Sequence, residues 1–442
     1  MIPYHVIRRK RDGIELSVEE LKGFFTAFAE GRLPEYQMAA FLMATCFRGL
    51  TPVELRTLVD LIINSGVRLD FSEIEGPKID KHSTGGVGDK VSLVLAPLVA
   101  SLGVTVPMMS GRGLGHSGGT VDKLESIPGF NVQPGLDAFR QQLERIGCAL
   151  ITQTDQITPL DKKLYALRDV SGTVESIPLI ASSIMSKKIA EGIDGLVLDV
   201  KRGNGAFLPE LDQSLTLAQT MISIGEMYGK QTVALLTAMD RPLGHAVGNA
   251  IEVEESIHVL RGEGPSDLKE VTVALAVEML LLAGWADARQ ARADLEGALA
   301  DGRAATKFQQ IIEAQGGNPA VVDDPALLPQ AQVRHVLEAK ADGWIEAMDV
   351  RAIGDAAVQL GAGRATLDAV IDHSVGFLIT AKTGDRIVRG QPIASVFATD
   401  ESSAALAIEA LHAAITVSDE TPAPPLPLVS HRVTAEGIEE LA

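Results

Sequence analysis

The sequence predicts an α/β protein that combines a small all-helical domain, a large mixed α/β domain with a mostly parallel central sheet, and a C-terminal β-hammerhead subdomain. Three observations support this fold class. Helix-start signals dominate the first 65 residues, short β-branched runs alternate with amphipathic stretches from Lys78 onward, and a turn-rich apolar segment follows Trp344. The chain of 442 residues is long enough for two or three packed units.

Two capping boxes mark helix starts near the N-terminus. In each, a hydroxyl residue stands three positions before a glutamate, as Ser17 does before Glu20 and Thr51 before Glu54. Pro34 suits the first turn of a further helix. The apolar residues of this region are too many for a lone three-helix unit to bury, so we expect a subunit interface here. They are Leu21, Phe24, Phe25, Phe28, Phe41, Leu42, Met43, Leu55, Leu58, Leu61 and Ile62.

The middle of the chain has the pattern of a parallel sheet covered by helices. Strands are expected at residues 104–109, 149–151, 195–200 and 232–237, with amphipathic stretches between them. Residues 161–192 instead predict helix without intervening strands, so this segment is expected to return to the helical domain. The predicted domains are therefore discontinuous. Residues 1–65 and 159–192 form the helical domain, residues 66–158 and 193–340 the α/β domain, and residues 341–442 the hammerhead subdomain.

The hammerhead assignment depends on residues 375–398, which have the turn and strand spacing of the hairpins in biotin and lipoyl carriers. No acceptor lysine occupies the usual turn. We therefore expect a structural β-rich subdomain there, followed by an exposed proline-rich segment at residues 422–427.

Charge and cysteine content exclude several classes of protein. The 58 acidic and 39 basic residues give a formal charge of -19, which disfavours nucleic acid and anionic membranes as partners. Cys46 and Cys148 are expected to be free thiols in a reducing cytoplasm. Residues 91–109 carry no charge, but Pro97 and Pro107 within them indicate a buried helix followed by a buried strand instead of a membrane span.

The first chemically informative stretch is KIDKHSTGGVGDKVSL at residues 78–93, where a strand breaks into glycines and hydroxyl residues before a helix. Glycines let the backbone approach an anion closely, and the helix start adds a positive dipole end. Lys81 supplies a charge, and Ser83, Thr84 and Ser92 supply hydroxyl donors. The order of residues differs from the loop that binds nucleotide triphosphates, so a single phosphate is the expected ligand.

A second loop, at residues 106–130, also joins an apolar strand to a helix through glycines. Gly113, Gly115 and Gly118 match the G-x-G-x-x-G pattern of dinucleotide-binding folds. The expected acidic residue, Asp137, falls at a helix start and not at a strand end, so we regard the match as accidental. Ser110 and Thr120 lie at the two ends of this loop, and their hydroxyl groups are expected to bind the same phosphate from its other side.

Both loops, together with residues 161–192 (DKKLYALRDVSGTVESIPLIASSIMSKKIAEG) and 195–207 (GLVLDVKRGNGAF), resemble the pyrimidine nucleoside phosphorylase family. The likeness covers nearly the whole chain. It implies a cleft between the helical and α/β domains and a homodimer formed through the N-terminal helices. The implied phosphate ligands are Lys81, Ser83, Ser92, Ser110 and Thr120. The implied contacts to the base are His82, Tyr165, Arg168, Ser183 and Lys187.

The resemblance also implies a reaction, in which phosphate cleaves the bond between a pyrimidine and 2-deoxyribose. Thymidine, and deoxyuridine with it, would yield thymine or uracil and 2-deoxy-α-D-ribose 1-phosphate. Phosphate would attack the anomeric carbon while Arg168, Lys187 and His82 stabilise the charge that grows on the departing base. His82, with an ordinary pKa near 6.5, could also supply a proton.

Several alternatives remain open at this stage. A broader phosphorylase would also accept uridine, a phosphoribosyltransferase would need magnesium and pyrophosphate chemistry, and a nucleoside-binding protein would show no turnover. Met108 bears on the first alternative, because relatives that also accept uridine carry lysine there. If this position lies near the sugar, Met108 predicts a preference for 2′-deoxyribonucleosides.

We expect neither a cofactor nor a metal ion. Some relatives bind potassium through positions that match Gly88, Lys90, Leu243, Ala246 and Glu255. Where those relatives place a hydroxyl, this chain has Lys90, whose ammonium group would repel a second cation. Lys90 is therefore expected to pair with Glu255 and to take over the structural role of the ion.

Overall fold

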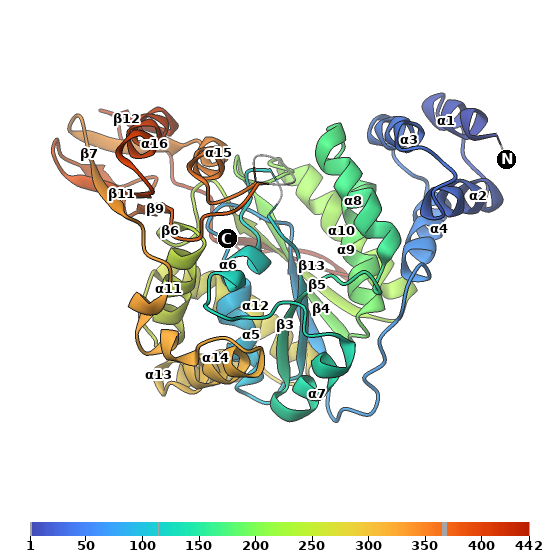
Figure 1. Cartoon of the computed structure of the whole chain (residues 1–442), viewed down its shortest axis with the longest axis horizontal. Coiled ribbons are helices and arrows are strands. Elements are labelled where there is room, and N and C mark those ends of the chain that lie inside the picture. Colours follow the sequence, from blue (N-terminus) through green and yellow to red (C-terminus); the bar gives the residue numbers. More distant parts are fainter. Residues whose placement is uncertain (1, 114, 365–368, 442) are drawn as a thin grey trace.

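The computed structural model describes residues 2–113, 115–364 and 369–441. A helical domain lies at one end of the molecule, a β-rich subdomain at the other, and a central sheet with its covering helices between them (Figure 1). This is the fold class that the sequence predicts.

The N-terminal helices surround a core of aromatic residues, in which the ring of Phe41 lies 4.9 Å from that of Phe24 and 5.4 Å from that of Phe25. Both predicted capping boxes are present, at the starts of the second and fourth helices. Leu164 and Leu179 come from the segment that was expected to return to this domain, and they pack in the same core. The helices of this domain are α1 (Pro3–Arg11), α2 (Val18–Ala29), α3 (Glu35–Arg48), α4 (Pro52–Ile63), α8 (Pro159–Ser171) and α9 (Ile177–Ala190).

The central sheet consists of parallel strands with an antiparallel edge. β1 (Ile79–Ser83), β4 (Gly195–Arg202) and β5 (Gln231–Ala238) are parallel neighbours. β2 (Val106–Ser110) and β3 (Cys148–Thr152) form a parallel pair, which a bridge between Lys78 and Thr105 joins to the edge of β1. Because these strands run in one direction, their carboxyl ends lie along one edge of the sheet, where ligands of open α/β folds bind.

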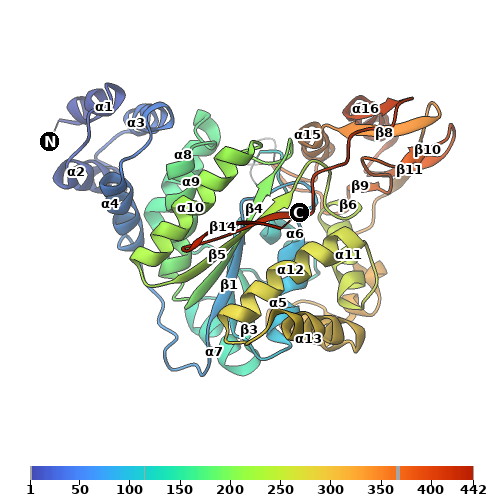
Figure 2. The same cartoon turned by 180° about the vertical axis from the view of Figure 1, so that it is seen from behind.

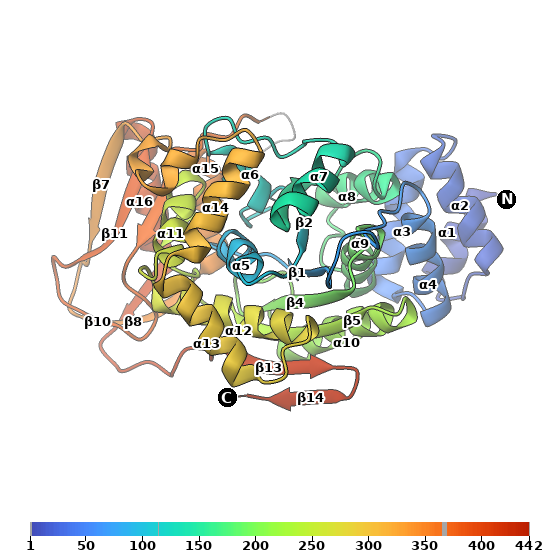
Figure 3. The ribbon, with the colours of Figure 1, turned by 90° about the horizontal axis from the view of Figure 1, so that it is seen from below.

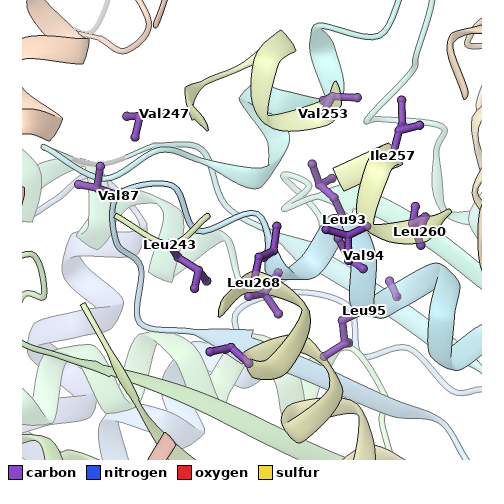
Figure 4. Packing of buried hydrophobic residues seen from close by; sticks show 14 of the residues in the cluster. Val87, Leu93, Val94, Leu95, Leu243, Val247, Val253, Ile257, Leu260 and Leu268 are labelled. Carbon is purple, nitrogen blue, oxygen red and sulfur yellow. The ribbon is translucent and has the colours of Figure 1, made fainter. Parts of the chain in front are cut away.

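Alternate residues of each central strand face different cores. In β4, Val197 packs toward α5 and α12, whereas Leu196 and Leu198 pack toward α9 and α10. Figure 2 shows α10 and α12 on the two sides of the sheet, and Figure 4 shows Leu93 and Ile257 among the side chains that meet where α5 and α11 pack. The helices of the α/β domain are α5 (Val91–Ala100), α6 (Thr120–Glu125), α7 (Leu136–Ile146), α10 (Leu211–Met227), α11 (Ala250–Leu260), α12 (Ser266–Leu282), α13 (Ala288–Ala300) and α14 (Arg303–Ala314), followed by the short 3-10 helices η1 (Pro319–Val322) and η2 (Pro325–Leu327).

The long uncharged segment at residues 91–109 forms α5 and β2, as the sequence predicts, and all ten residues of α5 are buried. Within the described part of the chain, none of the helices combines the length and apolar character that crossing a bilayer requires.

The C-terminal subdomain contains two small antiparallel sheets, with strand orders β6-β9-β11-β7 and β10-β8-β12. The chain segment predicted as a hammerhead hairpin supplies β9, β10 and β11. The elements of the subdomain are β6 (Ala246–Gly248), β7 (Val333–Glu338), β8 (Gly343–Met348), α15 (Val350–Leu360), β9 (Gly376–Ile379), β10 (Arg386–Ile387), β11 (Pro392–Ala398), α16 (Glu401–Ala414) and β12 (Ile415–Ser418).

The structure corrects the predicted extent of this subdomain, residues 341–442, at both ends. Its first strand, β7, begins at Val333, and β6 joins it from within the α/β domain. The last strands, β13 (Val429–Thr434) and β14 (Gly437–Glu440), instead extend the central sheet beyond β5 (Figure 3). The reason is that β5 would otherwise present an open edge of unpaired backbone groups, which β13 covers.

Candidate active site

A cavity of about 320 Å³ lies at the carboxyl ends of β1, β2, β3 and β4 and extends to α8 and α9. Every residue that the sequence predicts for the phosphate and base sites lines it. These residues are Lys81, His82, Ser83, Ser92, Ser110, Thr120, Tyr165, Arg168, Ser183 and Lys187. The structure therefore brings together, in one cavity, residues from two loops and two helices that are far apart in the sequence.

Strand β1 divides this cavity because successive side chains of a strand point to opposite faces of the sheet. Lys81 faces the α5 side, where its Nζ lies 3.3 Å from Asp199 Oδ2 and 3.5 Å from Ser92 Oγ. Asp80 faces the α9 side, where it forms an ion pair with Lys188. His82, two residues after Asp80, points to the same side of the strand as Asp80. The expected phosphate ligand Lys81 and the expected base ligand His82 therefore point to different sides of the sheet.

The first glycine loop is held by hydrogen bonds to its own hydroxyl residues and to the neighbouring strand. Ser83 Oγ donates to Asp89 Oδ2 at 2.5 Å and accepts from the Gly85 amide at 3.1 Å. The Thr84 amide donates to the carbonyl of Asp199 at 3.0 Å. These contacts place the Ser83 hydroxyl beside the start of α5, where the helix dipole favours an anion.

The second loop is closed by an acidic side chain and by a glycine with no space for a side chain. Asp122 Oδ2 accepts from the Gly113 amide at 2.7 Å. A Cβ on Gly119 would lie 2.0 Å from the amide nitrogen of Gly113, so this position requires glycine. Thr120 then begins α6 at the cavity wall.

Contacts at the tip of the second loop reach the other domains. His116 Nε2 lies 2.9 Å from the carbonyl of Gly205, and Arg351 Nε lies 3.4 Å from His116 Nδ1. Arg351 also forms an ion pair, at 3.1 Å, with Glu175 between α8 and α9. Arg351 thus links the C-terminal subdomain to both the loop and the helical domain.

The part of the cavity lined by the predicted phosphate ligands, here called the anion end, has charged residues in its floor that the sequence prediction did not assign. Asp89 and Lys201 line the cavity, and Asp199 lies beneath it, 2.8 Å from Lys201 Nζ. Burial would raise the pKa of Asp89, but the ammonium groups of Lys201 and Lys81 hold it well below its usual value. Burial lowers the pKa of Lys201, but Asp199 and Asp89 outweigh this and raise it. Both groups are therefore charged at neutral pH.

A sequence signal for these residues exists. In residues 195–201 the two charged residues, Asp199 and Lys201, are two and four positions after Val197, so a β-strand places all three on one face of the sheet. What the sequence does not show is that this strand pairs with β1 and that Asp199 stands opposite Ser83.

In the part of the cavity lined by α8 and α9, where the predicted base ligands lie and which is here called the base end, two cationic side chains have different surroundings. Lys187 Nζ donates to Ser183 Oγ at 2.7 Å and to Asp161 Oδ2 at 2.8 Å, and it lies 5.3 Å from the centre of the Tyr165 ring. The Ser183 contact confirms that these two residues share a helix face. Burial raises the pKa of Tyr165, so its hydroxyl stays protonated.

Arg168 is held by backbone carbonyls. Its guanidinium donates to the carbonyls of Thr173 at 3.2 Å, Val174 at 2.7 Å and Leu179 at 2.9 Å. No ion pair to Arg168 forms within the described ranges 2–113, 115–364 and 369–441. Burial lowers the pKa of Arg168, but a guanidinium remains charged at neutral pH. Arg168 thus presents a fixed positive charge to the cavity.

His82 differs from the expectation drawn from its ordinary pKa. Burial lowers the pKa of His82 well below its usual value, and the ammonium groups of Lys188 and Lys187 lower it further. The imidazole is therefore neutral at neutral pH. It can hydrogen-bond a ligand but is not the imidazolium acid that a pKa near 6.5 would allow.

The expectation that Met108 lies near the sugar and favours 2′-deoxyribonucleosides is wrong. Its side chain is fully buried in the core that contains α5, and the cavity is lined instead by the next residue, Met109. Because Met108 points away from the cavity, it cannot discriminate between ribose and deoxyribose by direct contact.

The expected pairing of Lys90 with Glu255 is confirmed. Lys90 Nζ donates to Glu255 Oε2 at 2.7 Å and to the carbonyls of Leu243 at 2.7 Å and Ala246 at 3.0 Å, and its side chain is fully buried. Burial would raise the pKa of Glu255, but Lys90 holds it below its usual value. The pair ties the start of α5 to α11, and the two carbonyl contacts tie it to residues 243–246.

Comparison with known proteins agrees with this architecture. Residues 4–66 match a model described as the glycosyl transferase family, helical bundle domain, and residues 75–305 match the glycosyl transferase family, a/b domain. Residues 344–418 match the pyrimidine nucleoside phosphorylase C-terminal domain. In fold the chain resembles anthranilate phosphoribosyltransferase from Thermus thermophilus, with a TM-score of 0.56 and 17% identity over 70% of this chain and 99% of that one.

Sequence relatives define the family more closely. The pyrimidine-nucleoside phosphorylase of Geobacillus stearothermophilus is 49% identical over 397 residues, which cover 90% of this chain and 92% of the relative. The pyrimidine-nucleoside phosphorylase of Staphylococcus aureus (strain N315) is 44% identical over 432 residues, which cover 98% and 99%. The chain belongs to the pyrimidine-nucleoside phosphorylase family.

The low pKa of His82 predicts an effect on stability at acid pH. Below about pH 6.5 the unfolded chain binds a proton at this histidine that the folded chain does not bind, so acid lowers the free energy of unfolding by at most about 1.4 kcal/mol per pH unit. We expect His82→Gln to lose less stability than the wild type between about pH 6.5 and pH 5.5. Urea unfolding across this range measures the difference, and exposed His5→Gln is the control. Equal acid sensitivity of His82→Gln and the wild type would contradict the assignment.

Proposed function

We propose that the protein catalyses the reversible phosphorolysis of thymidine and deoxyuridine, giving thymine or uracil and 2-deoxy-α-D-ribose 1-phosphate. One observation carries this proposal. The cavity combines hydroxyl groups and Lys81 around two glycine loops on one side of β1 with Arg168 and Lys187 at its opposite end. An anion and a base that gains negative charge on leaving need such separate sites.

In the proposed reaction, Lys81, Ser83, Ser92, Ser110 and Thr120 hold inorganic phosphate beneath the sugar. A phosphate oxygen forms a bond to the anomeric carbon from the face opposite the base. The bond from that carbon to the pyrimidine nitrogen breaks, and its electron pair leaves on the base.

The charge that develops on the pyrimidine spreads to its carbonyl oxygens. Arg168 and Lys187 stabilise it, because both are fixed by hydrogen bonds before the reaction begins. Neutral His82 donates a hydrogen bond to the base, and Ser183 and Tyr165 orient the ring.

Apolar side chains beside the proposed base site support thymidine as a substrate. Ile180 and Ile184 line the cavity from α9, the helix that carries Ser183 and Lys187, and Leu217 lines it from α10. Contact with the thymine methyl group would contribute about 1 kcal/mol. The names of the relatives favour a second candidate, a broader pyrimidine-nucleoside phosphorylase that also accepts uridine.

The direct test is release of thymine from thymidine and inorganic phosphate in the presence of a metal chelator. We expect release that depends on phosphate and not on magnesium, with thymidine and deoxyuridine used more efficiently than uridine. Equal kcat/KM for uridine and thymidine would favour the broader phosphorylase. Turnover that needs magnesium and pyrophosphate would favour a phosphoribosyltransferase, and binding without product would exclude an enzyme.

Loss of either cation at the base end should remove most activity. Lys187→Ala and Arg168→Ala each delete a charge that faces the leaving group, so we expect kcat/KM for thymidine to fall by about 10² to 10³-fold. Lys163→Ala is the matched control, since Lys163 lies on α8 with Arg168 but is exposed. Circular dichroism checks the fold of each variant. Near-normal turnover in either folded variant would contradict the assigned roles, whereas His82→Ala should lose less activity than both.

We propose that the enzyme needs no cofactor and no potassium ion, because the Lys90 ammonium contacts Glu255 and two carbonyl oxygens in the place where the resemblance puts the ion. Equal rates of thymidine phosphorolysis are expected in potassium and sodium buffers. Lys90→Thr should make the rate depend on potassium. A wild-type requirement for potassium over sodium would overturn this proposal.

We also propose a homodimer formed through the N-terminal helices. Tyr36, Met43 and Phe47 are exposed along α3 at a spacing that places them on one face, with Tyr36 at 73% and Phe47 at 79% exposure. Val170 adds an exposed apolar side chain from the adjacent α8. An apolar face of this kind indicates an interface between subunits.

The expected state in solution is therefore a dimer that Phe47→Glu converts to a monomer, because burying the introduced carboxylate would cost more than the interface gains. Sedimentation velocity measures this. Val336→Glu, which changes an exposed apolar residue of the C-terminal subdomain, is the control and should remain dimeric. A wild-type monomer would exclude the interface.

We further propose a cytoplasmic location, on the ground of the two free thiols of Cys46 and Cys148.

A further inference from the structure

Lys201 occupies an unusual position at the anion end of the cavity. It lies at the carboxyl end of β4, its side chain is fully buried, and it still lines the cavity. Its Nζ forms an ion pair with Asp199 Oδ2 at 2.8 Å, and no other described residue accepts a hydrogen bond from it. An ammonium group has three N–H donors, so this buried group keeps donors that a ligand can accept.

The carboxylates around Lys201 are shared with two of the proposed phosphate ligands. Asp199 Oδ2 lies 3.3 Å from Lys81 Nζ as well as 2.8 Å from Lys201 Nζ. Asp89 lies 3.8 Å from Lys201 Nζ and accepts the hydrogen bond of Ser83. The carboxylate of Asp199 thus connects Lys201 to Lys81, and the carboxylate of Asp89 connects Lys201 to Ser83.

The balance of charge shows why the site needs Lys201. The two carboxylates, Asp89 and Asp199, are both buried beside the place where an anion would bind. Lys81 can compensate only one of them, so Lys81 alone would leave the floor with a net negative charge that repels phosphate. With Lys201, the two lysines and the two aspartates have no net charge. The backbone N–H groups of the first loop and the positive N-terminal end of α5 can then attract the anion.

We propose that Lys201 is a phosphate-binding residue, whose ammonium group donates a hydrogen bond to an oxygen of the inorganic phosphate that Lys81 and Ser83 also hold. This inference rests on the proposed function. It differs from a purely structural role, in which Lys201 would only neutralise the two carboxylates and would affect both substrates alike.

Steady-state kinetics with both substrates varied separates these two roles. In Lys201→Met we expect KM for phosphate to rise by about tenfold or more while KM for thymidine is unchanged, because only the anion loses a charge-assisted hydrogen bond. In Lys201→Arg, which keeps the charge, KM for phosphate should rise less. An unchanged KM for phosphate in folded Lys201→Met, or an equal rise in both KM values, would overturn the proposal.

Lys10→Met is the matched control. Lys10 is also a buried lysine paired with a buried carboxylate, Glu54, at 2.6 Å, but it lies on α1 and does not line the cavity. Its loss should leave the ratio of the two KM values as in the wild type. A rise in the phosphate KM alone in Lys10→Met would mean that deletion of any buried lysine has this effect, and would also overturn the proposal.

Two measurements keep the inference testable if the methionine variant does not fold. Thermal denaturation with inorganic phosphate alone should show stabilisation of the wild type that is smaller in Lys201→Arg. A crystal structure of the wild type with phosphate should place one of its oxygens about 3 Å from Lys201 Nζ. Phosphate bound in the cavity without this contact would contradict the inference. Absence of phosphorolysis by the wild type would instead refute the proposed function.

Discussion

The carboxylate of Asp199 is the interaction on which the anion end of the cavity depends. It lies between the ammonium groups of Lys81 and Lys201, and its second oxygen accepts a hydrogen bond from Thr237 at 2.5 Å. Each of these charges alone would cost several kcal/mol to bury, whereas together they compensate one another. Asp199 thus fixes two lysines at the floor of the cavity, and its backbone carbonyl holds the first glycine loop through Thr84.

A second buried ionic cluster lies on the other side of β1 and fixes α9, the helix that carries Ser183 and Lys187. Lys188 of α9 pairs with Asp80 of β1 and, at 2.9 Å, with Glu191, and it donates to the carbonyl of Met109 in β2 at 2.8 Å. The helix that carries Lys187 is therefore attached to the two strands that carry Lys81 and Ser110. The alternation of side chains along β1 keeps the two clusters apart, and this separation places the proposed anion and base sites on opposite sides of the strand.

Local signals in the sequence were sufficient for much of this structure. Capping boxes depend on residues three apart, and the glycine loops lie between recognisable strands and helices, so both could be predicted. Three features could not. The pairing of β13 with β5 joins segments nearly two hundred residues apart, the direction of Met108 depends on which face of β2 is covered, and the low pKa of His82 results from burial beside lysines of α9. The sequence also does not show that Asp199 and Lys201 lie at the cavity, because their position depends on the register between β1 and β4.

In the proposed reaction, phosphate and base occupy opposite sides of the sugar in one cavity. Nuclear magnetic resonance of a mixture of enzyme, thymidine and inorganic phosphate tests this most directly, because the configuration of the sugar phosphate records the face from which phosphate attacks. We expect 2-deoxyribose 1-phosphate as the α anomer, with the anomeric centre inverted relative to the nucleoside. A β anomer, or release of the base without any sugar phosphate, would contradict it.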